Sequence, residues 1–131
     1  MEHRKLRAST YTLFFRTLSF HWNVRGENFA QYHKLFQKQY EDLFDATDLL
    51  AERVRAIGGL APTSLSEIVK LSSLAADAGA PVSKTMIANL LSEHEASARA
   101  LKSAANEFSR ANDKATENML LDMVLKHEKV S

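Results

Sequence analysis

Residues 29–59 have the sequence FAQYHKLFQKQYEDLFDATDLLAERVRAIGG. Apolar side chains recur in this stretch at the spacing of one face of an α-helix, and neither proline nor glycine interrupts them before Gly58-Gly59. A glycine pair ends a helix well, because glycine tolerates the left-handed conformation that follows many helix C-termini. The stretch therefore predicts one helix from Phe29 to Ile57, about 28 residues and about 42 Å long.

The segments on either side of this helix have different characters. Residues 6–24 repeat the helical pattern and predict a first helix, which the polar, glycine-containing residues 25–28 end. Residues 60–81 contain both prolines of the chain, with many serines and alanines, and predict a long crossover. Ser64 and Glu67 have the spacing of a capping box, which predicts a short helix inside that crossover.

Two more helices are expected after the crossover. Ser83 is expected to cap a third helix that runs to Phe108, and Asn112-Asp113 is expected to form a turn and N-cap before a fourth. Four helices with one long connection between the second and third have the connectivity of ferritin-like bundles. The predicted fold class is therefore all-α, a ferritin-like four-helix bundle with a short extra helix in the crossover, as a single domain over residues 1–131.

Composition excludes several classes of protein. Seventeen basic and 16 acidic side chains give a net charge of +1, so no global field attracts nucleic acid or an anionic membrane. The chain has no cysteine, which excludes disulfides and thiolate metal sites and fits a reducing compartment. No apolar run approaches the roughly 18 residues of a membrane helix. A cytoplasmic protein without a membrane partner is the expectation.

Histidines give the first indication of a metal site. Ferritin-type iron centres inside a bundle use Glu-x-x-His pairs, and no such pair ends at His21, His33, His94 or His127. His21 ends the first predicted helix and His33 lies one turn into the second. The short turn at Gly26 therefore places both imidazoles at the same end of the bundle.

Two carboxylates complete the candidate site. Asp48 and Glu52 are four residues apart and hence on one face of the long helix. Asp48 follows His33 by 15 residues, about 22 Å along a straight helix, whereas metal–ligand bonds are about 2 Å. If two copies of this helix pack antiparallel across a two-fold axis, His33 of one copy lies opposite Asp48 and Glu52 of the other. Such a mixed imidazole and carboxylate site suits Fe(II), Zn(II) or Mn(II).

A family resemblance joins these residues. Nearly the whole chain resembles the Dps-type mini-ferritins, the DNA-binding proteins from starved cells, on the motifs Phe20-His21-Trp22-Asn23-Val24, Gly26, Asn28-Phe29, His33, Phe36 and Asp48 ahead of Ala51-Glu52-Arg53. The resemblance implies a hollow shell of twelve subunits that oxidises and stores iron, preferably with hydrogen peroxide. It implies a ferroxidase centre at each two-fold interface, with His21 and His33 from one subunit and Asp48 and Glu52 from its partner.

The chain departs from the family pattern at two places. Gln37 stands four residues after the second histidine, where the family commonly has an acid, so a second iron position is doubtful; Glu41, one turn on, is a distant substitute. The family's DNA binding is commonly attributed to a lysine-rich N-terminal extension. Here only Arg4, Lys5 and Arg7 precede the helix core, so we expect little DNA affinity.

Other residues receive mainly structural interpretations. His94 and His127 are lone histidines on their helices, and Met119 and Met123 are expected to fill the core. Trp22 is expected to pack at the subunit interface, with quenching of radicals as a lesser alternative, and the same applies to Tyr40. Three carboxylates are expected to form a solvated face, with an acidic entry pore at a three-fold axis as the less favoured alternative. They are those of Asp113, Glu117 and Asp122.

Two rival functions stay open at this point. One is a structural or DNA-compacting shell whose metal site has decayed, with Gln37 as its first sign. The other is a zinc-binding oligomer without redox chemistry. Both share the predicted fold with an iron-oxidising shell and differ from it in what the site does.

Overall fold

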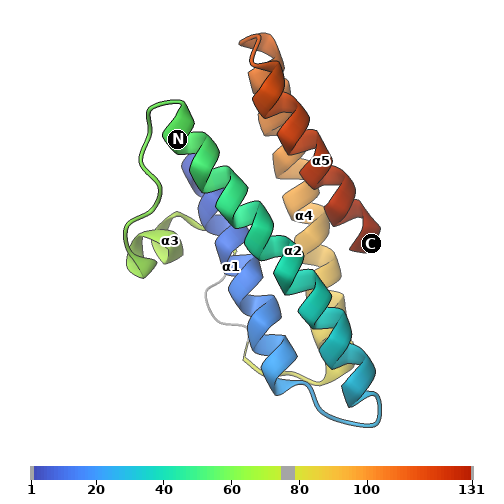
Figure 1. Cartoon of the computed structure of the whole chain (residues 1–131). Coiled ribbons are helices and arrows are strands. Elements are labelled where there is room, and N and C mark those ends of the chain that lie inside the picture. Colours follow the sequence, from blue (N-terminus) through green and yellow to red (C-terminus); the bar gives the residue numbers. More distant parts are fainter. Residues whose placement is uncertain (1, 75–78, 131) are drawn as a thin grey trace.

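The structure is a computed structural model that describes residues 2–74 and 79–130, and in this part of the chain all regular structure is helical (Figure 1). Five helices follow one another: α1 (Glu2–Asn23), α2 (Phe29–Ala56), α3 (Leu65–Leu71), α4 (Ser83–Arg110) and α5 (Lys114–Val130). None of the described helices is long and apolar enough to cross a bilayer. The predicted all-α class is confirmed.

The bundle consists of two antiparallel hairpins. α1 packs along α2, α4 packs along α5, and α1 also contacts α4 (Figure 1). The crossover leaves the end of α2 and returns to the opposite end of the bundle before α4 begins, and α3 lies within it against α1. This is the long connection between the second and third bundle helices that the sequence predicted.

Local signals set most helix ends as expected. α2 ends at Ala56, and Gly58 adopts a positive φ of 96°, which explains why glycine follows this helix. Ser64 caps α3 by accepting a hydrogen bond from the backbone N–H of Glu67 at 3.1 Å. Asp113 caps α5 in the same way, accepting from the N–H of Thr116 at 3.1 Å.

The expected cap at Ser83 is wrong. Ser83 is the first residue of α4, and the N-cap position belongs to Val82, which has no side-chain acceptor. Val82 lies directly after Pro81 and has the extended backbone of an N-cap, with φ −64° and ψ 155°, so the helix begins one residue earlier than a serine cap requires. Its carbonyl accepts the first helical hydrogen bond, from Met86.

The core divides into two apolar clusters. The cluster nearer the α1–α2 turn is centred on Phe20 and Phe36, whose rings lie 6.3 Å apart. The other cluster, built largely from α4 and α5, contains Leu101, Leu120 and Met123. Met119 packs against it, so the two methionines fill the core as predicted.

Polar pairs lie where the two clusters meet. Along α4, Glu93 and His94 lie between Leu90 of one cluster and Ala98 of the other. Arg16 of α1 donates a hydrogen bond to Glu93 and forms a buried ion pair with it. His94 contacts His127 of α5, with the two Nδ1 atoms 2.7 Å apart. These two histidines, expected to stand alone, are a pair, because the antiparallel packing of α4 on α5 brings them together.

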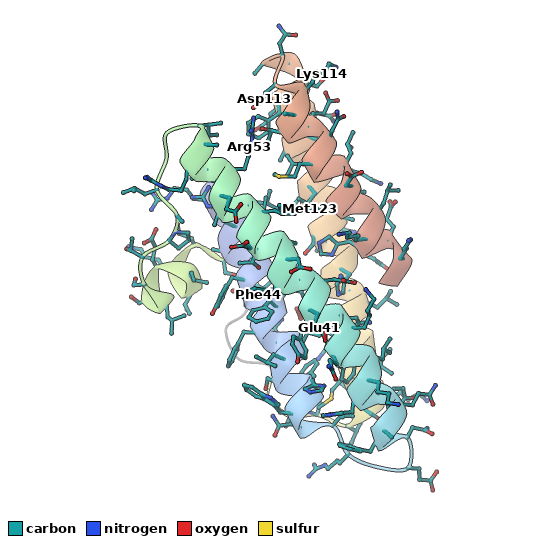
Figure 2. The ribbon with its side chains drawn as sticks, in the orientation of Figure 1. Glu41, Phe44, Arg53, Asp113, Lys114 and Met123 are labelled. Atoms are coloured by element: carbon teal, nitrogen blue, oxygen red, sulfur yellow. The ribbon has the colours of Figure 1, made fainter. Side chains whose placement is uncertain are left out.

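Arg53 ties α2 to the start of α5. Its Nη2 donates to Oδ1 of Asp113 at 3.1 Å, and its Nε donates to the Thr116 hydroxyl (Figure 2). The hydrogen bonds from Thr116, followed by the charge of Arg53, hold the pKa of Asp113 below its usual value. Asp113 therefore serves helix capping and helix packing.

Replacing Phe36 by alanine is expected to destabilise the bundle by about 3–5 kcal/mol, because its fully buried ring leaves a cavity. Leu35→Ala is the matched control. Leu35 is the adjacent residue but is 42% exposed, so its loss is expected to change stability by less than about 1 kcal/mol. Urea unfolding followed by far-ultraviolet circular dichroism measures both, and equal losses would contradict the assignment of Phe36 to the core.

Candidate metal centre

The turn between α1 and α2 brings His21 and His33 together. Gly26 has φ +111°, a conformation that L side chains rarely adopt, and this allows the chain to reverse within residues 24–28. The two imidazole rings stack with centroids 3.7 Å apart and planes 19° from parallel. The prediction that both histidines lie at one end of the bundle is thus met, while their role as ligands remains a prediction.

Each histidine fixes the tautomer of the other. Nδ1 of His21 donates to the carbonyl oxygen of His33 at 2.7 Å, and Nδ1 of His33 donates to that of His21 at 2.8 Å. A carbonyl oxygen can only accept, so each Nδ1 carries the proton and the lone pair of each neutral ring is at Nε2. Hydrogen-bonded Nδ1 and a free Nε2 lone pair are the usual state of a metal-ligating histidine.

Two aromatic rings of α2 pack against this histidine pair. Phe29 stacks on His33 with centroids 5.0 Å apart, and Tyr40 meets His21 edge-on at 5.2 Å. Phe29, His33 and Tyr40 follow one another at intervals of four and seven residues, so one face of α2 carries all three rings. This spacing is visible in the sequence, although the stacking order is not.

Asp48 and Glu52 also form a pair, on the exposed side of α2. A hydrogen bond with Asp48, and then the negative charge of Asp48, raise the pKa of the Glu52 carboxyl. The neighbouring arginines do not take these acids: Arg53 binds Asp113, and Arg55 donates to the carbonyl of Gly59 at 3.1 Å. Two adjacent carboxylates that no arginine neutralises are suited to binding a metal cation.

One chain does not bring the four predicted ligands together. α2 runs unbroken through His33 and Asp48, which leaves about 22 Å between the imidazoles and the carboxylates. Accordingly, the described residues contain no group of three or more histidine, aspartate or glutamate side chains able to hold one metal ion. A site with both kinds of ligand requires a second copy of the chain.

Gln37 lies between the two halves of the site. Its amide nitrogen donates to Oε1 of Glu41 at 3.1 Å, so its carbonyl oxygen is the atom left to approach a cation. Glu41 thereby positions the Gln37 amide, and both side chains are exposed. The arrangement provides a neutral oxygen where a carboxylate is usual.

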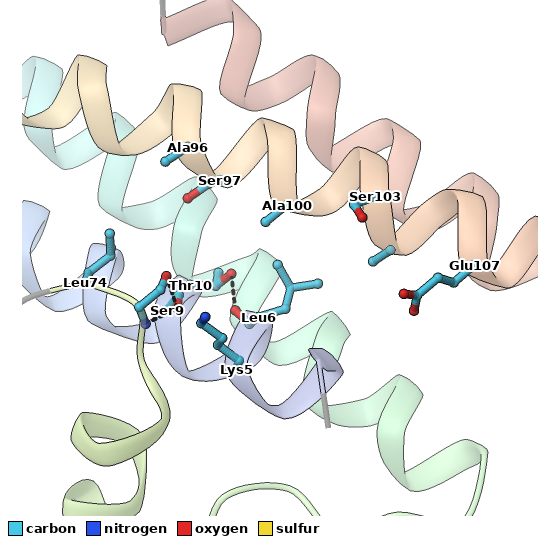
Figure 3. Close-up of a pocket in the computed structure, with 12 residues that line it drawn as sticks. Lys5, Leu6, Ser9, Thr10, Leu74, Ala96, Ser97, Ala100, Ser103 and Glu107 are labelled. Carbon is cyan, nitrogen blue, oxygen red and sulfur yellow. Dashed lines mark hydrogen bonds between the residues drawn. The ribbon is translucent and has the colours of Figure 1, made fainter.

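A separate pocket of about 240 Å³ lies between α1 and α4 (Figure 3). Small and hydroxyl-bearing residues such as Ser9, Ser97 and Ala100 line it, and the only carboxylate among its lining residues is that of Glu107. Ser9 is already bonded to Ser73, with the two hydroxyl oxygens 2.9 Å apart. The pocket lacks the donors of an iron site.

Asp48→Asn is expected to lower the pKa of Glu52 towards the ordinary glutamate range, because it removes the carboxyl–carboxyl hydrogen bond and the negative charge that raise this pKa. Carbon NMR titration of the Glu52 carboxyl in metal-free protein measures the change. Asp45→Asn, an exposed acid two turns away, is the control and should leave the Glu52 pKa unchanged. An unaltered value in Asp48→Asn would show that the two carboxyls do not interact.

Comparisons with known proteins identify the family of the chain. Residues 4–130 match the ferritin family, described as a ferritin-like domain. A DNA protection during starvation protein of Helicobacter pylori is 30% identical over 127 residues, covering 96% of this chain and 88% of that protein. An uncharacterised low temperature-induced protein of Nostoc sp. is 33% identical over 129 residues, covering 95% of this chain and 70% of the relative.

Solved structures extend the likeness to the whole fold. A Dps protein from Bacillus brevis superposes with a TM-score of 0.93 at 29% identity, covering 98% of this chain and 87% of that one. Dps from Staphylococcus aureus gives 0.92 at 26% identity, covering 98% and 86%. With the family match over nearly all of its length and these relatives over its whole bundle, the chain belongs to the ferritin-like proteins, as a Dps-type mini-ferritin.

Proposed function

We propose that this chain oxidises and stores iron in a closed shell, with each ferroxidase site formed by His21 and His33 of one subunit and Asp48 and Glu52 of its two-fold partner. Membership of the family supports iron storage and stress protection in general terms. The main support for the specific site is the orientation of the two imidazoles, because both Nδ1 atoms donate to backbone carbonyls and leave both Nε2 atoms available.

Exposed aromatic side chains beside the histidines support a two-fold interface there. Trp22 is 60% exposed and meets Phe15, 50% exposed, edge-on, with centroids 6.3 Å apart. Phe44 on α2 is exposed as well (Figure 2). Large exposed apolar side chains are typical of a surface that another protein covers. A second copy placed there would bring its carboxylates to the imidazoles.

The chemistry follows from the ligands. Fe(II) is the substrate, and two neutral nitrogens with two carboxylates hold it while stabilising the harder Fe(III) product. Hydrogen peroxide, the oxidant implied by the resemblance, is reduced to two hydroxide ions by two electrons, one from the bound Fe(II) and one from a second Fe(II) that binds transiently beside it near Gln37. Water hydrolyses the ferric product, which releases protons and deposits ferric oxyhydroxide in the cavity of the shell. Removing Fe(II) and peroxide together prevents formation of hydroxyl radicals.

The rival of a DNA-compacting shell gains little support from the N-terminal cations. Arg4 is paired with Glu67 at 2.9 Å, and Arg7 is buried. Burial, and then the charge of Arg4, lower the pKa of Arg7. Of these three basic residues, Lys5 alone is both exposed and outside such an ion pair, so few cations face a phosphate backbone. Retarded DNA migration that weakens steeply with salt would favour the rival.

Mixed shells test the shared site. His33→Ala and Glu52→Gln are each expected to abolish fast Fe(II) oxidation. The two variants are unfolded, mixed and refolded together. A dimer with one subunit of each variant keeps one complete site, because the Glu52→Gln subunit supplies both histidines and the His33→Ala subunit supplies both carboxylates. Random mixing therefore restores about a quarter of wild-type activity. Absorbance of the ferric product after peroxide addition measures it.

Two results would contradict the proposal. No recovery in the mixture would place all ligands within one subunit, and wild-type oxidation no faster than in buffer would remove the enzymatic function. Joint refolding of His21→Ala with His33→Ala is the control, since no dimer of these two has a complete site. Metal analysis of protein grown with iron separates an iron shell from a zinc-binding one.

Gln37→Glu is expected to raise the number of Fe(II) ions bound at each site from one towards two, because a carboxylate replaces a neutral amide oxygen. Anaerobic Fe(II) titration followed by calorimetry gives the stoichiometry. Gln37→Leu, which offers no oxygen, is the control and should stay at one. Equal stoichiometry in Gln37→Glu and wild type would show that this position does not limit the second iron.

A further inference from the structure

We propose that the buried His94–His127 pair is an acid-operated latch that holds the C-terminal half of α5 against α4. The proposal concerns the bundle core and does not depend on the iron chemistry. His94 is 2% exposed and His127 5% exposed, and their rings lie 4.9 Å apart with the two Nδ1 atoms at 2.7 Å.

The hydrogen bond between the two histidines requires that one of the two Nδ1 atoms be unprotonated. Neither Nδ1 atom can accept once it is protonated, so a single proton lies between the two atoms 2.7 Å apart. In the neutral pair, one ring is protonated at Nδ1 and the other at Nε2. Nε2 of His94 is buried without a hydrogen-bond partner, which gives a charge on that ring no local stabilisation.

The surroundings offer little compensation for a charged ring. A cavity of about 40 Å³ adjoins the pair, and its charged lining residues are Asp42 of α2 and Lys126 of α5. Both oxygens of Asp42 already accept from Lys38, at 2.9 and 3.0 Å. Glu93, next to His94 on α4, is bound by Arg16 of α1. The Asp42 carboxylate is thus committed to Lys38, and Lys126 adds a like charge. Oε1 of Gln39, which also lines the cavity, and Oε2 of Glu93 are buried, but neither forms a hydrogen bond with the histidines.

Protonation consequently opposes the closed contact. Burial, together with the His127 charge, lowers the pKa of His94 to about 3, and burial lowers the pKa of His127 to about 4. The first added proton puts a positive charge in the buried pair. The second added proton leaves a hydrogen on each Nδ1 atom, so the two N–H groups repel each other. Because an exposed imidazole has a pKa of about 6.5, the latch is fully closed above that pH and is progressively weakened below it.

The two ends of α5 respond differently. At the start of the helix, Asp113 binds Arg53 and Thr116, and its lowered pKa keeps this anchor charged in mild acid (Figure 2). Just beyond His127, Glu128 forms an exposed ion pair with Lys102 of α4, at 2.9 Å. Acid therefore releases the C-terminal half of α5 while the first half stays attached.

Hydrogen exchange at pH 7.5 and 5.5, corrected for the intrinsic rate at each pH, tests the latch. With two histidines freed to titrate near 6.5, the ratio of open to closed forms is expected to rise about 100-fold over this range. The amides of residues 122–129 should lose protection first, with residues 114–119 and α1 unchanged. In the His94→Leu/His127→Leu double variant, the pH response should disappear.

Lys102→Gln is the matched control. It breaks the exposed ion pair between the same two helices and should keep the full pH response. Simultaneous loss of protection throughout the wild-type bundle, or none in residues 122–129, would overturn the latch. Should the double variant fail to fold, imidazole NMR of the wild type decides, since titration of either histidine near 6.5 in the closed protein contradicts it.

A metal site is the competing explanation of the same pair. Zn(II) added at pH 7.5 to a His33→Ala variant, which lacks the intersubunit site, should leave exchange in α5 unchanged. Slower exchange that a further His94→Leu substitution abolishes would assign the pair to metal binding and overturn the latch.

Discussion

The straightness of α2 is the constraint on which the rest of the structure depends. The helix runs from Phe29 to Ala56 without a break, so His33 and Asp48 keep the axial separation set by the rise of the helix, about 22 Å. No rearrangement of side chains closes such a gap. A metal centre that uses both residues has to be completed by another chain, which makes oligomer formation a condition for the chemistry.

The turn before α2 has the opposite effect and brings residues together. Gly26 lets the chain reverse so tightly that His21 and His33 exchange hydrogen bonds with each other's backbone. The carbonyl of His21 is free to accept because α1 ends two residues later, where no further helical N–H reaches it. The end of one helix therefore orients the imidazole of His33 on the next.

The sequence predicted the helices and the fold because their signals are local. Apolar spacing, the Gly58-Gly59 stop and the Asp113 cap each act within a few residues. It also predicted which histidines meet across the Gly26 turn, since that turn is short. The His94–His127 pair escaped prediction because these residues are 33 positions apart and meet only through the packing of α4 on α5. The Val82 start of α4 was missed for a different reason: Val82 has no side-chain acceptor, so the sequence carries no capping signal at that position.

The two histidine pairs show how environment, and not residue type, decides chemical role. In the first pair, each Nδ1 bonds a carbonyl, so both rings keep an Nε2 lone pair for a cation. In the second, the Nδ1 atoms bond each other inside the core, so one proton is shared and the contact is lost when both Nδ1 atoms carry a proton. The first arrangement is the one that the proposed metal site requires. The second buries the titratable groups in the packing of α5, which is why we propose a response to protons there and not at the first pair.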